Sequence, residues 1–238
     1  MPIRAADHSP ARLIDAVGVA RRFGARWVLR GGSLDVSRGE SVGLLGANGS
    51  GKSTLLRILA TLLRPTAGRA ELCGYDVVKD ADNVRRSIGL LSHAPGLYDD
   101  LSARENLRFA LSMLERPNDS VAIDEVLARV GLEGVRDTRV RGFSAGMQRR
   151  LALARLILAR PRVLLLDEPY ANLDTDGVSV VNATIAETVN GGGAALVVLH
   201  EVAPALDVLN RMVTILDGRI GEPFITRAHA GAAEAVPR

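Results

Sequence analysis

The fold is decided by Gly46-Ala47-Asn48-Gly49-Ser50-Gly51-Lys52-Ser53-Thr54, which fits the pattern G-x-x-x-x-G-K-[ST]. The apolar run at 42–45 before it predicts a buried strand, and residues 54–59 after it predict a helix. Glycines in such a strand–loop–helix turn let successive backbone N–H groups point inward at the positive end of the helix. The stretch therefore predicts a loop that cradles the phosphates of a nucleotide.

Two side chains of this loop complete the expected chemistry. Lys52 is expected to reach the β- and γ-phosphates, and the Ser53 hydroxyl is expected to ligate the Mg²⁺ ion that accompanies the nucleotide. The loop residues expected to bind the nucleotide are Gly46, Asn48, Gly49, Ser50, Gly51, Lys52, Ser53 and Thr54. The competing interpretation is a plain glycine-rich turn with an exposed lysine.

Composition indicates a globular protein whose net charge does not point to nucleic acid. The chain has 238 residues, of which 47% are hydrophobic, and its 30 Lys+Arg and 27 Asp+Glu leave a net charge of only +3. The single Cys73 cannot form an intrachain disulfide, so we expect a reducing compartment and a buried thiol. No run of about 18 apolar residues is present, so the chain is not expected to cross a membrane itself.

Periodicity predicts a mixed α/β core with a helical insertion. Strands are expected at 13–20, 33–36, 42–45, 69–72, 87–92, 162–167, 194–199 and 212–216. Between about 102 and 136 the apolar period becomes helical, which predicts a helical lobe inserted into the core. A further helix is expected over 148–159, with Ser144 as its plausible N-cap.

Acidic and imidazole side chains follow two of the expected strands. The apolar strand at 162–166 ends in Asp167 and Glu168, and the strand at 194–199 ends in His200. A buried parallel strand delivers such side chains to the carboxyl edge of a sheet, where the phosphate loop also opens. The competing interpretations are a solvated turn for the two acids and a satisfied core histidine for His200.

Three other side chains stand outside these motifs. Phe23 lies in an expected loop at 21–27, where its ring is about as well suited to stack on adenine as to anchor the core. Arg149 and Arg150 are most simply explained as a solvated helix face.

Five motifs in a fixed order resemble the ATP-binding cassette of an ABC transporter over roughly residues 10–220. They are the phosphate loop, the segment around His93, Phe143-Ser144-Ala145-Gly146-Met147, Asp167-Glu168 and His200. The resemblance implies an α/β fold of the P-loop NTPase class, specifically an ABC-type nucleotide-binding domain. It would occupy residues 1–225, with an α-helical subdomain inserted at about 93–160 and an antiparallel β subdomain, and a disordered tail would follow at 226–238.

The resemblance also implies roles for single residues. Phe23 matches the aromatic residue that stacks on adenine. Asp167 matches the carboxylate that holds magnesium through water, and Glu168 matches the one that polarises the attacking water. His200 matches the switch histidine that contacts the γ-phosphate, and Asp174 falls in the D-loop.

Two motifs depart from the family pattern. In the signature motif LSGGQ, which completes the site of the opposite subunit, this chain has Ala145 and Met147 in place of a glycine and the glutamine. Ser144 and Gly146 are kept, so the signature is expected to function. At the Q-loop, His93 stands where a glutamine is usual, which replaces an amide contact to magnesium by an imidazole that can bind water or couple to a partner.

The implied function is ATP hydrolysis, with ATP and Mg²⁺ as cofactors, by a subunit that dimerises around ATP with itself or a related subunit. It would lie peripherally on the cytoplasmic face of the cell membrane, power export through a separate integral membrane subunit and bind no nucleic acid. Segments 57–65, 91–96, 101–109 and 143–151 resemble the ATP-binding subunit of the haem exporter for cytochrome c maturation. The alternatives are a drug or lipid exporter and, less favoured, a soluble ABC ATPase without a transport role.

Overall fold

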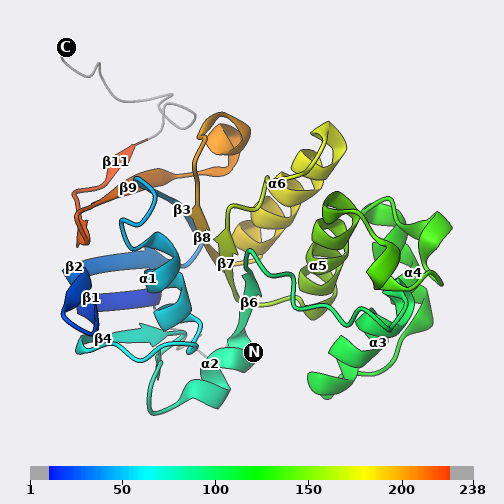
Figure 1. Ribbon diagram of the computed structural model, residues 1–238, viewed down its shortest axis with the longest axis horizontal. Coiled ribbons are helices and arrows are strands. Elements are labelled where there is room, and N and C mark those ends of the chain that lie inside the picture. Colours follow the sequence, from blue (N-terminus) through cyan, green and yellow to red (C-terminus); the bar gives the residue numbers. More distant parts are fainter. Residues whose placement is uncertain (1–10, 226–238) are drawn as a thin grey trace, which may run out of the picture.

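The computed structural model describes residues 11–225, and the expected disordered tail at 226–238 lies outside them (Figure 1). The strands are β1 (Arg12–Phe23), β2 (Arg26–Ser37), β3 (Glu40–Leu45), β4 (Ala67–Leu72), β5 (Tyr75–Asp76), β6 (Ile88–Leu91), β7 (Val163–Asp167), β8 (Ala194–Val198), β9 (Arg211–Leu216), β10 (Arg219–Ile220) and β11 (Phe224–Ile225). The α-helices are α1 (Lys52–Leu59), α2 (Ala81–Ser87), α3 (Ala103–Met113), α4 (Ser120–Arg129), α5 (Ala145–Ala159) and α6 (Thr175–Asn190). Short 3-10 helices occupy Glu133–Val135, Val140–Gly142 and Ala203–Val208.

The larger sheet has the strand order β10-β9-β3-β8-β7-β6, with β11 paired to β9. Strands β9, β3, β8, β7 and β6 run parallel to one another. Every residue of β7 and β8 is buried, because helices cover both faces of a parallel sheet. Parallel pairing brings the carboxyl ends of these strands to one edge, as the sequence predicted.

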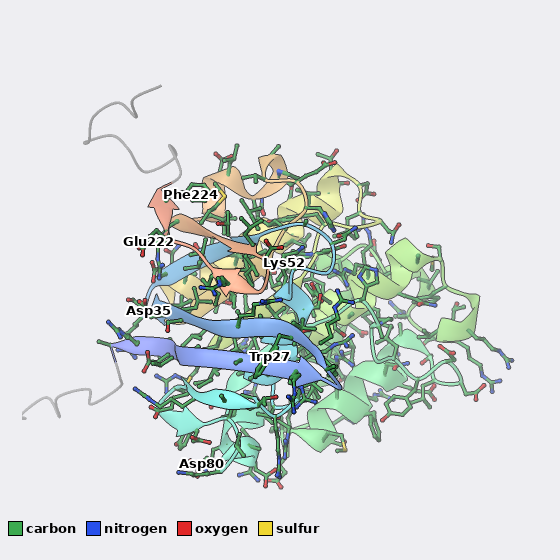
Figure 2. All side chains as sticks on the ribbon, turned by 60° about the vertical axis from the view of Figure 1, so that its left-hand side comes forward. Trp27, Asp35, Lys52, Asp80, Glu222 and Phe224 are labelled. Atoms are coloured by element: carbon green, nitrogen blue, oxygen red, sulfur yellow. The ribbon has the colours of Figure 1, made fainter. Side chains whose placement is uncertain are left out.

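The smaller sheet is antiparallel, with the order β2-β1-β4-β5, which confirms the expected antiparallel subdomain. Figure 2 labels Trp27 and Asp35 toward the two ends of β2 in this sheet. The expected loop at 21–27 is wrong, since β1 continues to Phe23 and pairs there with Arg26 across a two-residue turn. The two strands are therefore longer than the apolar segments from which they were predicted, because hydrogen-bonded pairing between them continues to Phe23 and Arg26.

Helices flank the larger sheet on both faces. Successive side chains of β7 point to opposite faces of the sheet. Leu165 packs in the hydrophobic core on the side of α1, whereas Leu164 and Leu166 pack in the hydrophobic core on the side of α5 and α6. The helices α2 and α6 were not predicted. No helix of residues 11–225 is long and apolar enough to cross a membrane.

The helical lobe consists of α3, α4 and the outer side of α5 (Figure 1). Ser102 begins α3 with a capping box, and Ser144 begins α5 as predicted, where its Oγ accepts a hydrogen bond of 3.2 Å from the Met147 N–H. Leu151 faces the lobe while Leu153 faces the sheet, so α5 lies between them. The first turn of α5 therefore has a fixed position relative to the edge of the sheet.

Candidate nucleotide site

The carboxyl ends of four neighbouring strands carry most of the predicted site. The phosphate loop follows β3, and His200 follows β8 after one intervening residue. Asp167 is the last residue of β7, directly across the sheet from Val198 of β8, and Glu168 comes next. His93 lies in the loop that follows β6. The structure therefore brings phosphate-binding, acidic and imidazole groups to one edge of the sheet.

The phosphate loop has the backbone that its glycines permit. Gly46 has a φ of +152°, and a Cβ there would lie 2.4 Å from the carbonyl oxygen of Ile215. Gly51 has a φ of +113° and forms the N-cap of α1. Only glycine fits the close approach at Gly46, and the left-handed Gly51 turns the chain so that the N-terminus of α1 faces the loop.

Lys52 is not the exposed lysine of a plain turn. Its side chain is only 6% exposed, and Nζ donates hydrogen bonds of 2.5 Å to the Gly46 carbonyl and 3.0 Å to the Ala47 carbonyl. The ammonium group therefore lies across the mouth of the loop, bonded to uncharged acceptors that an anion can replace.

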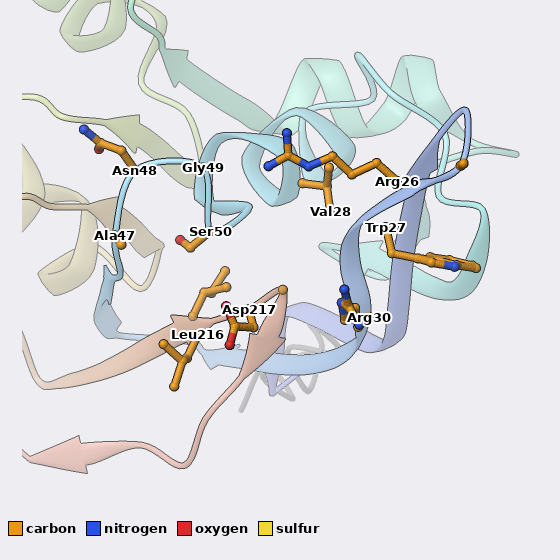
Figure 3. A pocket seen from close by; sticks show the side chains of 13 residues that line it. Arg26, Trp27, Val28, Arg30, Ala47, Asn48, Gly49, Ser50, Leu216 and Asp217 are labelled. Carbon is orange, nitrogen blue, oxygen red and sulfur yellow. The ribbon is translucent and has the colours of Figure 1, made fainter.

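A cavity of about 270 Å³ opens beside the loop. It is lined by Arg26, Val28, Asn48, Gly49, Gly51, Lys52, Ser53, Thr54 and Glu168. Arg26 and Val28 were not singled out from the sequence, although both follow closely after Phe23. Figure 3 shows a larger neighbouring cavity of about 590 Å³, which shares Arg26 and Gly49 with this one. In it Arg26 reaches from β2 toward the loop at Gly49 and Ser50, whereas the ring of Trp27 points away.

Asp167 and Glu168 lie in different surroundings. Asp167 is only 8% exposed, and its Oδ1 is buried without a hydrogen-bond partner among the described residues, so the solvated turn is wrong for this acid. An unpaired buried carboxylate oxygen is costly, and a hydrated cation would satisfy it. The Asp167 carboxylate and the Ser53 hydroxyl of the phosphate loop are oxygen ligands of the kind that Mg²⁺ prefers. These two residues therefore fit a magnesium ion.

Glu168 contacts His200 directly. Its Oε1 lies 2.9 Å from His200 Nε2, within hydrogen-bond distance. The His200 side chain is 46% exposed, which excludes a histidine satisfied inside the core. Glu168 has a φ of +50°, a left-handed conformation that is uncommon and costly for a residue other than glycine. The local backbone thus directs this carboxylate toward both the cavity and the histidine.

Several predicted site residues do not line this cavity, among them Phe23, His93, Ser144, Gly146 and Asp174. Phe23 ends β1 with 43% exposure, and the Arg21 guanidinium lies 4.7 Å from its ring centroid. A core anchor is therefore the wrong interpretation of this ring. His93 is exposed on its loop.

The signature residues, expected to complete the site of another subunit, lie beside the segment that carries Asp174. A Cβ at Gly146 would lie 2.8 Å from the Asn172 carbonyl oxygen, so the first turn of α5 lies against the segment that leads into α6. Asp174 is the N-cap of α6, and its Oδ1 accepts a 2.9 Å hydrogen bond from the Gly177 N–H and another from Arg150. Ser144 is exposed at the start of α5.

Arg149 and Arg150 do not form a solvated helix face. Arg149 is only 7% exposed. The Arg150 guanidinium donates to Asp174 and, over 2.8 Å, to the Val130 carbonyl at the end of α4. Both arginines therefore hold parts of the chain together.

Comparison with known proteins agrees with this geometry. The family model described as ABC transporter matches residues 29–171. The cytochrome c biogenesis ATP-binding export protein CcmA of Xanthomonas axonopodis pv. citri is 46% identical, over 77% of this chain and 86% of its own length. The daunorubicin resistance ATP-binding protein DrrA3 of Streptomyces coeruleorubidus is 40% identical, over 85% of this chain and 65% of its own length.

A solved structure shows the same architecture. The ATP-binding cassette MJ0796, a dimer in a post-hydrolysis state with ADP and Pi, superposes with a TM-score of 0.80 at 26% identity, over 90% of this chain and 99% of that one. The parallel sheet, phosphate loop and paired acids thus define an ATP-hydrolysing nucleotide-binding domain. The chain belongs to the ABC transporter family, as one of its ATP-binding subunits.

Proposed function

We propose that this chain is the ATPase subunit of an exporter and that the cargo is haem for cytochrome c biogenesis. The observation that supports the ATPase mechanism is the contact between Glu168 and His200, because Glu168 also lines the cavity that holds Lys52. The similarity to the Xanthomonas export protein supports the cargo. The exporter's membrane-spanning part would be a separate subunit, with this chain bound to the cytoplasmic face of the membrane.

ATP would bind with its phosphates in the phosphate loop and its adenine against Phe23. Lys52 would exchange its two carbonyl acceptors for β- and γ-phosphate oxygens, with little movement because the ammonium already lies across the loop. Arg26, which lines the same cavity, adds positive charge beside the phosphates. Ser53 and Asp167 would hold Mg²⁺, which neutralises charge on the β- and γ-phosphates when bound.

Glu168 would orient the attacking water through a hydrogen bond to its carboxylate. His200 would keep that carboxylate in place through Oε1 and contact the γ-phosphate with the same imidazole. The half-exposed position of His200 leaves it accessible to a bound nucleotide.

Ser144, Gly146 and Asp174 would act on the nucleotide of a second ATPase subunit, either another copy of this chain or a related one. This proposal is supported by their separation from the cavity of their own chain and by the dimeric state of the MJ0796 structure. Two sites would then form between two subunits, each with a phosphate loop from one and a signature from the other.

The membrane subunit would dock between the sheet and the helical subdomain at about 93–160. A groove of about 320 Å³ lies there, lined in part by Tyr98, Phe109 and Met113, all of which are exposed hydrophobic residues. Tyr98 and Phe109 stack edge to face with 4.7 Å between ring centroids. His93 lies on the loop that leads from β6 into this groove.

His93→Ala is expected to weaken coupling to the membrane subunit while ATP affinity changes by less than about twofold. The reason is that His93 is exposed and does not line the phosphate cavity. Nucleotide titration of the isolated chain and stimulation of its ATPase activity by the membrane subunit are the two measurements. Loss of ATP binding with normal stimulation would show that His93 belongs to the nucleotide site.

A strain that lacks the gene is expected to lose holocytochromes c and to keep its resistance to hydrophobic drugs. Haem-stained gels and drug-sensitivity assays measure the two outcomes, and the intact gene supplied in trans is the control. The similarity to the daunorubicin resistance protein makes a drug exporter the second candidate. Normal holocytochromes c together with drug sensitivity would favour that candidate and leave the ATPase mechanism intact.

A further inference from the structure

Arg149 is a buried cation whose hydrogen bonds all go to backbone carbonyl oxygens. It lies on α5, and Nη1 donates 2.7 Å to the Ser92 carbonyl at the end of β6. Nη2 donates to the carbonyls of Asp167, over 2.7 Å, and of Glu168. Nε donates to the Pro169 carbonyl over 3.5 Å. One guanidinium thus joins α5, the end of β6 and the segment that carries both acids.

The two bonds from Nη2 have a specific consequence for Glu168. The Asp167 carbonyl belongs to the peptide group before the Glu168 Cα, and the Glu168 carbonyl belongs to the peptide group after it. Holding both groups fixes φ and ψ of Glu168, since these two torsions are the soft degrees of freedom between them. The Glu168 N–H is anchored as well, by a 3.1 Å hydrogen bond to the Val198 carbonyl of β8.

The conformation that is held in this way is a costly one. At a φ of +50°, Glu168 is in the left-handed region, which is unfavourable for a residue with a Cβ. Without the guanidinium, the backbone bonds from the Glu168 N–H to the Val198 carbonyl and, over 3.3 Å, from the Ala171 N–H to the Glu168 carbonyl would remain, but the two peptide groups would lose their common donor and their torsions could relax toward ordinary β or helical values. The carboxylate would then leave the position that lies 2.9 Å from His200.

We propose that Arg149 is a positioning residue for ATP hydrolysis, which fixes the backbone of Glu168 and so aims its carboxylate at the attacking water. This inference rests on the proposed role of Glu168. Arg149 itself lines neither the phosphate cavity nor the larger cavity of Figure 3, and it acts through the peptide groups on either side of Glu168.

Arginine suits this position because it carries five donors in a rigid plane, which reach four carbonyl oxygens at once. Lysine has three donors on one nitrogen atom at the end of a flexible side chain, so it can donate to only some of these four carbonyl oxygens. Burial lowers the pKa of Arg149, whereas the charges of Asp167 and Glu168 oppose that change. Arginine is not deprotonated in proteins, so the guanidinium carries its charge here.

The test uses Arg149→Lys and Arg149→Gln in the full-length chain, with kcat and KM for ATP measured separately. We expect Arg149→Gln to lower kcat by about 10–100-fold, because a misplacement of about 1 Å has an effect of this size. Arg149→Lys should recover part of the loss, and KM should change by less than about threefold in both. Arg104→Lys is the matched control, since Arg104 is a partly buried arginine that pairs with Asp124 and Asp137 inside the helical lobe.

A double-mutant cycle with Glu168→Gln separates positioning from general destabilisation. If Arg149 acts through Glu168, adding Arg149→Lys to Glu168→Gln should change single-turnover hydrolysis by less than about twofold, whereas independent effects would multiply. The inference is overturned if Arg149→Lys and Arg149→Gln both have the native kcat, or if the losses of single-turnover hydrolysis caused by the two substitutions multiply in the double mutant. Either result leaves the role of Glu168 intact. Native turnover in Glu168→Gln alone overturns that role, and the inference about Arg149 with it. Should Arg149→Gln not fold, Arg149→Lys carries both tests.

Discussion

Glu168→Gln is expected to lower ATP turnover by at least about 100-fold while ATP still binds. The amide keeps the shape of the side chain and can still contact His200, but it lacks the charge that orients and polarises water. The phosphate loop and Lys52 are untouched, so the contacts to the phosphates remain. Phosphate release at saturating ATP and equilibrium nucleotide binding are the two measurements.

The matched control is Glu125→Gln, since Glu125 is an exposed carboxylate on α4, outside the phosphate cavity. This control should hydrolyse ATP at the native rate. A loss of ATP binding in Glu168→Gln would mean that the carboxylate is needed to build the site, whereas native turnover would exclude it as the residue that orients water.

Lys52→Ala is expected to weaken ATP binding by about 30-fold or more and to abolish measurable hydrolysis. The ammonium is buried beside the loop, and removing one partner of a desolvated charge pair has an effect of about 2–5 kcal/mol. Isothermal titration with ATP, and with ADP for comparison, measures the loss. We expect ADP affinity to fall less, because ADP lacks the γ-phosphate.

Lys79→Ala is the control, since Lys79 is the other lysine of the chain and is exposed. It should bind ATP as the native protein does. Equal ATP affinity in Lys52→Ala and the native protein would contradict the proposed phosphate contact.

Local patterns were enough to predict the centre of the fold. The glycine spacing at 46–54 and the continuous apolar runs of β3, β7 and β8 identify both the phosphate loop and the edge of the sheet. These features are encoded within a few neighbouring residues, and parallel pairing then brings them together. Sequence patterns alone therefore place Lys52, Asp167 and His200 at the correct edge of the sheet.

Other elements depend on contacts that are distant in the sequence. The helix α6 was not predicted because its buried residues include Gly177 and Thr184 beside the apolar Val181 and Ile185, which weakens the apolar helical period. The full lengths of β1 and β2 come from their pairing with each other, which extends to Phe23 and Arg26.

The prediction that Arg149 lies on a solvated helix face was wrong for a physical reason. Two adjacent arginines on a helix normally indicate a solvated face, and that interpretation failed because the acceptors for Arg149 are backbone carbonyls. Every residue has a backbone carbonyl oxygen, so the acceptors at Ser92 and Asp167 cannot be recognised from the residue types in the sequence. The proximity of α5 to the ends of β6 and β7 was the missing information.

The proposed ATP-driven association of two subunits can be tested most directly by light scattering of Glu168→Gln with ATP and Mg²⁺. Because this variant should bind ATP and hydrolyse it only very slowly, the proposal predicts a species of twice the 25.3 kDa mass of one chain. The species should dissociate when ATP is replaced by ADP. A variant that remains monomeric with ATP while it hydrolyses ATP at the native rate would contradict both the shared site and the role of Glu168.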